Sequence, residues 1–160
     1  MSITSLPLSN GFSIPTLGLG TYKEENPEIL VKAVKAALAA GYRHFDCAYC
    51  YNNEHIIGKA LRDAIEESNG ALKREDLFIT SKCWNTFHSK EAVAGHIDEC
   101  LKKFGFDYLD LFLIHWPMGF KEKAGDFPMG EDGKPLLSNV HYTETYKVRF
   151  QSIFINYQVI

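Results

Sequence analysis

Apolar and polar positions alternate along the chain in blocks that predict strands followed by helices. Three long segments place apolar residues at the three- and four-residue spacing of an amphipathic helix, and short apolar runs separate them. The expected helices span residues 26–41, 53–68 and 89–105, and the expected strands span residues 17–21, 42–46, 77–82 and 108–115. The strand starts recur every ~25–35 residues, which is the size of a βαβ unit. We therefore expect an α/β fold with a parallel sheet and right-handed crossovers, and both a doubly wound sheet and a (β/α)8 barrel fit this order.

The ends of the first helix carry capping signals. Asn26 can accept hydrogen bonds from the free amides of the first turn, and Pro27 suits the first helical position. Gly41 suits the left-handed position that ends a helix. The residues expected to be buried on this helix are Ile29, Val31, Val34 and Leu38.

A short β-hairpin is expected before the first strand. Residues 6–15 form two short runs around Asn10 and Gly11, and Asn-Gly favours a two-residue turn because both residues tolerate a positive φ. Further along the chain, residues 118–138 are rich in Gly, Pro and charged side chains and are expected to form a loop.

Composition and charge exclude several classes of protein. The 160 residues are 46% hydrophobic, and a net charge of −3 provides no basic surface for nucleic acid or anionic lipid. The first ten residues lack the regions of a signal peptide, and the most apolar run, residues 108–116, is too short to span a bilayer as a helix. The four cysteines are too few for a disulfide scaffold. We expect a cytoplasmic protein with neither a nucleic-acid nor a membrane partner.

Titratable side chains stand at the ends of three expected strands. Asp46 ends the second strand, Lys82 the third and His115 the fourth, and Tyr51 lies in the loop just after Asp46. Taken alone, each is more commonly a helix cap or a core residue than a catalytic group. In a parallel sheet, the carboxyl ends of the strands share one edge, so these four side chains are expected to converge.

These four residue types together suit the protonation of a carbonyl oxygen as it becomes an alkoxide. A tyrosine has an unperturbed pKa of about 10. A lysine ammonium ~4 Å away favours the phenolate by roughly 4 kcal/mol at an effective dielectric constant of about 20, or about three pKa units. Asp46 would hold Lys82 in place and partly cancel this effect. We therefore expect a lowered pKa for Tyr51, and a hydrogen bond from His115 to a substrate oxygen.

Several segments of the chain resemble the aldo-keto reductase family. Residues 46–61 read Asp-Cys-Ala-Tyr-Cys-Tyr-Asn-Asn-Glu-His-Ile-Ile-Gly-Lys-Ala-Leu and match the family signature Asp-x-Ala-x-x-Tyr-x-Asn-Glu-x-x-x-Gly-x-Ala-Leu. Residues 79–84, 107–117 and 17–21 resemble further motifs of the family in the same order. The resemblance implies a TIM-type (β/α)8 barrel, here its first four β/α units after an N-terminal hairpin. It also implies reduction of small aldehydes or ketones with NADPH or NADH and without a metal.

The resemblance assigns roles to individual residues. Tyr51 matches the proton donor, Lys82 the residue that lowers its pKa, Asp46 the partner of Lys82, and His115 the group that orients the carbonyl. The positions that match cofactor contacts are Gly20, Thr21 and Asp46. The positions that match the substrate pocket are Tyr22, Trp84, His115 and Trp116. The family usually has Trp where Tyr22 stands, which is a mild departure.

The resemblance stops near residue 147. Residues 1–147 are expected to form part of the oxidoreductase domain, and residues 148–160 to form a divergent apolar tail, which should be poorly ordered or exposed. Four further strand-helix units of the family, which hold the nicotinamide amide and the adenosine phosphate, have no counterpart in these 160 residues. A complete family member is expected to be a monomer. The alternative function is that of an inactive truncated isoform or incomplete gene product that at most associates with other proteins or with itself.

Two groups of residues offer alternative metal sites. Cys47-x-x-Cys50, with His44 and His55 nearby, is compatible with zinc or with redox chemistry, but no second cysteine pair accompanies it. His44 and Asp46 with Lys82 and His115 resemble part of a metallohydrolase site, which would need more ligands. Gly18-x-Gly20 lacks the third glycine of a Rossmann fingerprint. We expect no metal.

Overall fold

The sheet consists of four parallel strands in chain order. The computed structural model describes residues 4–22, 24 and 26–151. The strands are β3 (Gly18–Gly20), β4 (His44–Asp46), β5 (Phe78–Cys83) and β6 (Leu111–Ile114), each hydrogen-bonded to the next in the order β3-β4-β5-β6. The predicted strands and their parallel pairing are confirmed.

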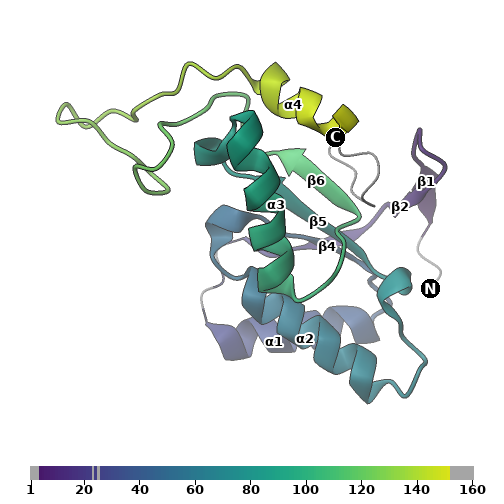
Figure 1. Ribbon diagram of the computed structural model, residues 1–160. Helices are drawn as coiled ribbons and strands as arrows, with labels where there is room; N and C mark the ends of the chain where they lie inside the picture. The colour runs from purple at the N-terminus through teal and green to yellow at the C-terminus, as the bar shows by residue number, and fades with distance from the viewer. Residues whose placement is uncertain (1–3, 23, 25, 152–160) are drawn as a thin grey trace.

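One layer of helices covers this sheet. The helices α1 (Pro27–Ala39), α2 (Glu54–Glu67) and α3 (Lys90–Phe104) lie side by side on the same face (Figure 1). The fourth helix, α4 (Tyr142–Gln151), contacts α3 and β6. Short 3-10 turns, η1 (Tyr49–Tyr51), η2 (Arg74–Asp76) and η3 (Asn85–Phe87), lie between these elements. A doubly wound sheet carries helices on both faces, so this arrangement corresponds to the first part of a (β/α)8 barrel.

The helix ends follow the predicted signals. The Asn26 side chain accepts hydrogen bonds from the backbone of Glu28 and Ile29, and Pro27 begins α1. The predicted buried face of α1 is wrong at one position, because Ile29 is 51% exposed while its neighbour Leu30 is buried. Adjacent residues of a helix point about 100° apart, and α1 is rotated so that Leu30 and Val34 enter the core while Ile29 faces solvent.

The N-terminal hairpin is confirmed, but its turn is longer than predicted. The strands β1 (Ser5–Pro7) and β2 (Ser13–Pro15) pair antiparallel. The five residues 8–12 connect them, and of Asn10 and Gly11 only the glycine has a positive φ, of 88°. The Asn10 side chain instead accepts a hydrogen bond from the backbone N–H of Phe12, which shapes the turn without a left-handed Asn.

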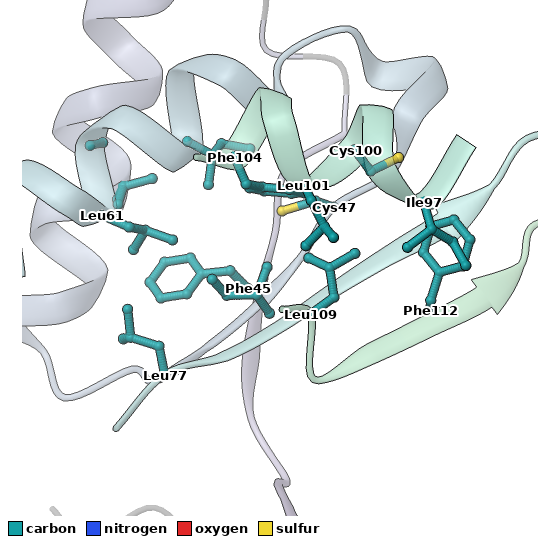
Figure 2. Packing of buried hydrophobic residues seen from close by; sticks show 14 of the residues in the cluster. Phe45, Cys47, Leu61, Leu77, Ile97, Cys100, Leu101, Phe104, Leu109 and Phe112 are labelled. Carbon is teal, nitrogen blue, oxygen red and sulfur yellow. The ribbon is translucent and has the colours of Figure 1, made fainter. Parts of the chain in front are cut away.

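The core lies between the sheet and the helix layer. Large apolar side chains from β4, α2, α3 and β6, among them Phe45, Leu61, Phe104 and Phe112, pack together there (Figure 2). The helices α2 and α3 approach closely at Gly58, where a Cβ would lie 2.2 Å from the carbonyl oxygen of Phe104. Only glycine therefore fits this crossing of the two backbones without a shift.

The expected boundary near residue 147 falls inside α4. Val148 is buried in the core, whereas an exposed or poorly ordered position was predicted for this part of the tail. Residues 152–160, which carry most of the predicted apolar tail, lie outside the described residues. Within the described part of the chain, no helix is both long and apolar enough to cross a membrane.

Candidate active site

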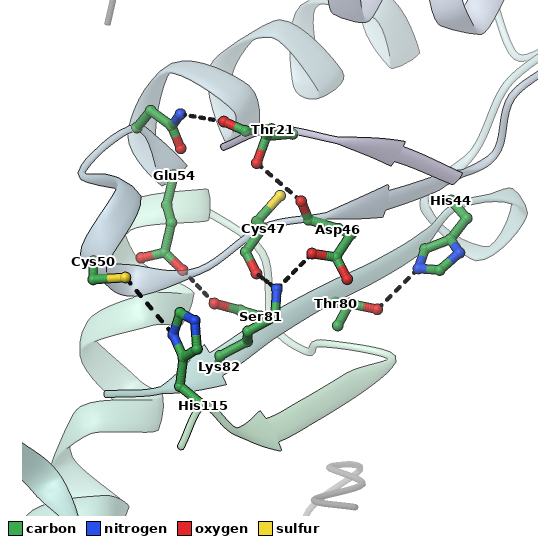
Figure 3. A network of polar contacts seen from close by, with 11 residues as sticks. Thr21, His44, Asp46, Cys47, Cys50, Glu54, Thr80, Ser81, Lys82 and His115 are labelled. Atoms are coloured by element: carbon green, nitrogen blue, oxygen red, sulfur yellow. Dashed lines mark hydrogen bonds and ion pairs between the residues drawn. The ribbon is translucent and has the colours of Figure 1, made fainter. Parts of the chain in front are cut away.

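The three predicted strand-end side chains and Tyr51 come together at one edge of the sheet. Asp46 and Lys82 lie at the carboxyl ends of β4 and β5, His115 directly follows β6, and Tyr51 ends η1 (Figure 3 shows Asp46, Lys82 and His115). The Lys82 Nζ lies 2.5 Å from the Asp46 Oδ1, which is the predicted ion pair. The Tyr51 ring centroid lies 5.3 Å from the Lys82 Nζ and 6.0 Å from the centroid of the His115 ring.

Lys82 is held by two oxygen acceptors. Besides the carboxylate of Asp46, its ammonium donates a hydrogen bond of 2.7 Å to the carbonyl oxygen of Cys47. The Lys82 side chain is 12% exposed and that of Asp46 is 40% exposed. The ammonium is therefore fixed inside the site, while the carboxylate remains accessible from solvent. The carbonyl of Cys47 could not be identified from the sequence, because every residue carries such a group.

The prediction of a lowered Tyr51 pKa is wrong. Burial raises the pKa of Tyr51 above its ordinary value of 10, and this effect exceeds the lowering caused by the charge of Lys82. Asp46 and Cys50 add to the rise. Tyr51 therefore carries its proton at neutral pH, and Lys82 moderates the pKa without bringing it close to 7.

His115 is a neutral ring surrounded by aromatic groups. Burial lowers its pKa, the positive charge of Lys82 lowers it further, and Asp46 opposes both. The His115 Nδ1 lies 3.7 Å from the Sγ of Cys50 (Figure 3). Its ring also packs edge-on against Trp84, with the centroids 5.2 Å apart. The ring is thus fixed from two sides.

The predicted cofactor positions lie beside Asp46. The Thr21 hydroxyl is buried and donates a hydrogen bond to the backbone oxygen of Asp46, so its side chain connects β3 to β4. Gly20 lies at an open position, where an added Cβ would meet no atom within 4 Å. The open position at Gly20 and the accessible carboxylate of Asp46 leave space for a ligand at this edge of the sheet. Lys82 is the positively charged residue among these strand ends, and its ammonium is already paired with the carboxylate of Asp46.

The predicted substrate-pocket aromatics differ in accessibility. Tyr22 is 67% exposed and Trp116 is 43% exposed, and both border the site. Trp84 is 1% exposed and donates a hydrogen bond from its indole N–H to the carbonyl oxygen of Asp126. Trp84 therefore packs against the rings of His115 and Trp116 and also fixes the loop that contains Asp126.

A buried acid next to the site was missed in the sequence. The Glu54 carboxylate accepts a hydrogen bond of 2.5 Å from the hydroxyl of Ser81, and its second oxygen has no partner among the described residues. Burial raises the pKa of Glu54 to about 7. The sequence does contain a sign that this position is buried. Glu54 lies on the same face of α2 as Ile57, Gly58 and Leu61, at the three- and four-residue spacing of a buried helix face.

The alternative metal sites are not assembled. The His44 ring is hydrogen-bonded to the Thr80 hydroxyl and the Pro15 carbonyl oxygen, whereas Asp46 is engaged by Lys82. Cys47 and the other three cysteines are free thiols. Within the part of the chain that the structure describes, no group of three His, Cys, Asp or Glu side chains could hold a metal ion.

The chain is similar in sequence and fold to known reductases. The model of the Aldo/keto reductase family matches residues 16–148. Aldo-keto reductase family 1 member A1 of Mus musculus is 44% identical over 147 residues, which cover 92% of this chain and 45% of that protein. Aldose reductase C of Dictyostelium discoideum is 40% identical over 148 residues, which cover 88% and 44%. The solved structure of the aldose reductase from Schistosoma japonicum has a TM-score of 0.90 and 42% identity.

These matches also define how much of the family fold is present. The chain is covered to 98% by the Schistosoma japonicum structure but covers 52% of it, so it spans about half the length of the proteins it matches. The four-stranded half of a (β/α)8 barrel agrees with that share. Because the family model accounts for most of the 160 residues and the signature in residues 46–61 supplies Asp46 and Tyr51 of the strand-end site, the chain belongs to the aldo/keto reductase family.

Proposed function

We propose that this chain carries the proton-transfer part of a site that reduces small aldehydes or ketones to alcohols with NADPH or NADH. The observation that supports this proposal is the convergence of Asp46, Lys82, Tyr51 and His115 at the carboxyl edge of a parallel sheet. Residues 1–147 belong to the oxidoreductase domain in this proposal, and residues 148–160 are a separate tail. Four free cysteines suit a reducing compartment such as the cytoplasm.

Tyr51 is the proton donor in this reaction. Its raised pKa keeps the hydroxyl protonated at neutral pH, so the proton is present when the carbonyl oxygen gains negative charge. The charge of Lys82 then stabilises the phenolate that is left, and Asp46 and the Cys47 carbonyl hold the ammonium in place. Both effects act on the transition state rather than on the bound substrate.

The remaining groups position the reactants. His115, as a neutral imidazole, donates a hydrogen bond to the carbonyl oxygen, and the exposed rings of Tyr22 and Trp116 border the space for an apolar substrate. Gly20 and Asp46 would hold the nicotinamide-ribose end of the cofactor, which supplies the hydride when bound. Hydride and proton together convert the carbonyl group into an alcohol.

The test distinguishes the contribution of the site residues to activity from the effect of having only half of a barrel. Turnover of an aromatic aldehyde with NADPH is measured for the 160-residue chain and for a chimera in which residues 1–147 are joined to the second half of the Schistosoma japonicum aldose reductase. We expect the chimera to reduce the aldehyde, Tyr51→Phe to lower its kcat by at least about 100-fold, and a chelator to leave the rate unchanged.

Tyr49→Phe is the matched control. Tyr49 lies in the same 3-10 turn, but its ring packs against Phe87 and His96, away from the strand-end site. Tyr49→Phe should therefore keep most of the activity. A chimera in which Tyr51→Phe and Tyr49→Phe behave alike would contradict the role of Tyr51. Co-purification of an inactive 160-residue chain with an intact reductase would instead support the alternative of an associating, non-catalytic product.

A further inference from the structure

The thiol of Cys50 meets the ring of His115 inside the proposed site. Cys50 is the middle residue of η1, directly before Tyr51, and its side chain is half-buried. Its Sγ lies 3.7 Å from the His115 Nδ1 (Figure 3). Among the described residues, Cys50 is the one hydrogen-bonding partner of this ring. Nothing in the proposed proton transfer uses this contact.

Two arrangements of hydrogen are compatible with this contact. Either the thiol donates to an unprotonated Nδ1, or a protonated Nδ1 donates to the sulfur. An unprotonated imidazole nitrogen is a good acceptor, whereas a thiol sulfur is a weak one. The first arrangement therefore makes the better hydrogen bond, and it leaves the hydrogen of a neutral ring on Nε2.

We infer that Cys50 is a positioning residue, whose S–H donates to the Nδ1 of His115 and so holds the ring in the tautomer that carries its hydrogen on Nε2. The partner of one ring nitrogen commonly decides which nitrogen is protonated. In the proposed function, on which the meaning of this inference rests, the Nε2 hydrogen is the one donated to the carbonyl oxygen. Cys50 thus acts on the reaction through His115 and does not itself react.

Burial is the main effect that keeps both partners neutral. Burial raises the pKa of Cys50 to about 11, so the thiol retains its hydrogen at neutral pH. The pKa of His115 is lowered by burial and by Lys82, and Asp46 acts in the opposite direction. The other neighbours of the ring are the uncharged side chains of Tyr51, Trp84 and Trp116. A neutral thiol beside a neutral imidazole is the state that the S–H to Nδ1 hydrogen bond requires.

A second cysteine–histidine contact in the chain provides an internal reference. The Nε2 of His96 accepts a hydrogen bond of 3.2 Å from the backbone N–H of Trp84, so this ring carries its hydrogen on Nδ1. Cys100 lies 4.0 Å from the same Nε2. Because a backbone donor already sets the tautomer of His96, its state should not depend on Cys100.

The test is a long-range ¹H–¹⁵N NMR spectrum of the ¹⁵N-labelled 160-residue chain at pH 8, in which the shifts of the two ring nitrogens identify the tautomer. The His115 signals are assigned by their loss in His115→Gln. We expect an unprotonated Nδ1 for His115 and the opposite tautomer for His96. Cys50→Ser retains a hydroxyl donor and should preserve the His115 shifts. Cys50→Ala should change the ratio of the two tautomers by about fivefold toward Nδ1–H, which corresponds to about 1 kcal/mol.

Cys100→Ala is the matched control and should leave both histidines unchanged. A wild-type spectrum with the hydrogen of His115 on Nδ1 would overturn the inference without any variant. Unchanged His115 shifts in a folded Cys50→Ala chain would also overturn it. Because the readout needs neither cofactor nor turnover, its outcome is independent of whether the 160-residue chain reduces carbonyl compounds.

Discussion

Replacement of Glu54 by Gln is expected to remove a large loss of stability that the wild-type chain undergoes as the pH rises. Burial raises the pKa of Glu54 from 4.5 to about 7, and the hydrogen bond from Ser81 offsets only part of this rise. Between these two pH values, the folded state binds more protons at Glu54 than the unfolded state does. The free energy of unfolding therefore falls as the pH rises from about 4.5 through 7 and is constant above that range.

The magnitude follows from the two pKa values. At about 1.36 kcal/mol for each pKa unit, the full loss is about 3 kcal/mol, of which roughly 2 to 3 kcal/mol falls between pH 5 and pH 8. The groups that act on Glu54 besides Ser81 are Lys103 and Cys100, which lower its pKa, and Glu99, which raises it. Glu54 has 1% of its surface exposed, so solvent screens these interactions weakly.

Other groups change the stability in the opposite direction. Burial lowers the pKa values of His44, His88, His96 and His115. Below about pH 6.5, the unfolded state binds more protons at these residues, so their contribution to stability is lost as the pH falls. The pH dependence of the free energy of unfolding of the wild type therefore contains the effects of both Glu54 and the histidines. The difference between wild type and Glu54→Gln isolates the carboxyl group, because the histidines are common to both chains.

The assay is urea unfolding between pH 5 and pH 8, followed by the fluorescence of the two tryptophans. Because its amide does not titrate, Glu54→Gln is expected to gain about 2 to 3 kcal/mol of stability relative to the wild type between pH 5 and pH 8. Glu67→Gln, on the exposed end of the same helix, should follow the wild-type curve. A difference between wild type and Glu54→Gln that stays constant across the pH range would refute the reasoning.

Three further predictions concern packing, a buried ion pair and the cofactor. Gly58→Ala should destabilise the chain by about 1 to 3 kcal/mol in urea unfolding, because the new Cβ would overlap a carbonyl oxygen of α3. Gly95→Ala, at an open position of α3, should instead stabilise it by up to about 1 kcal/mol, and equal effects of the two changes would contradict the argument. The guanidinium of Arg74 lies 2.7 Å from the half-buried carboxylate of Asp110. Arg74→Leu removes this ion pair and should lower the free energy of unfolding by about 3 kcal/mol. A decrease of less than about 1 kcal/mol would show that solvent replaces the ion pair. Fluorescence titration of the 160-residue chain with NADPH should show weak binding or none, because the chain spans about half the length of the reductases it matches, and micromolar affinity would disprove this.

The positions of the site residues could be predicted because they depend on topology alone. Apolar runs separated by helices predict parallel strands, and parallel strands bring their carboxyl ends to one edge. Asp46, Lys82 and His115 each stand at such an end, so their convergence needed no knowledge of side-chain packing. Tyr51 is expected to join them because it follows Asp46 closely in the chain, and the family resemblance in residues 46–61 then gives it the role of proton donor; in the structure it lies on a 3-10 turn.

The properties that depend on packing could not be predicted in the same way. The pKa expected for Tyr51 from the sequence includes the charge of Lys82 but not burial, which is the larger effect in the structure. Likewise, Ile29 and Leu30 are equivalent in hydrophobicity, and only the rotation of α1 relative to the sheet decides which of them is buried. Both errors have one physical origin, since the environment of a side chain is set by distant segments that local periodicity does not describe.

The alternation of side chains along β5 explains how the missed acid relates to the site. Successive residues of a strand point to opposite faces, so Ser81 reaches Glu54 on the helix side while Lys82 reaches Asp46 on the other side (Figure 3). The segment between Asp46 and Glu54, which carries Tyr51, is therefore hydrogen-bonded at both ends to two adjacent residues of one strand. A shift of either contact would move the Tyr51 hydroxyl relative to the Lys82 ammonium. The position of the proposed proton donor thus depends on a buried carboxyl group that takes no part in the proposed chemistry and whose pKa burial raises to about 7.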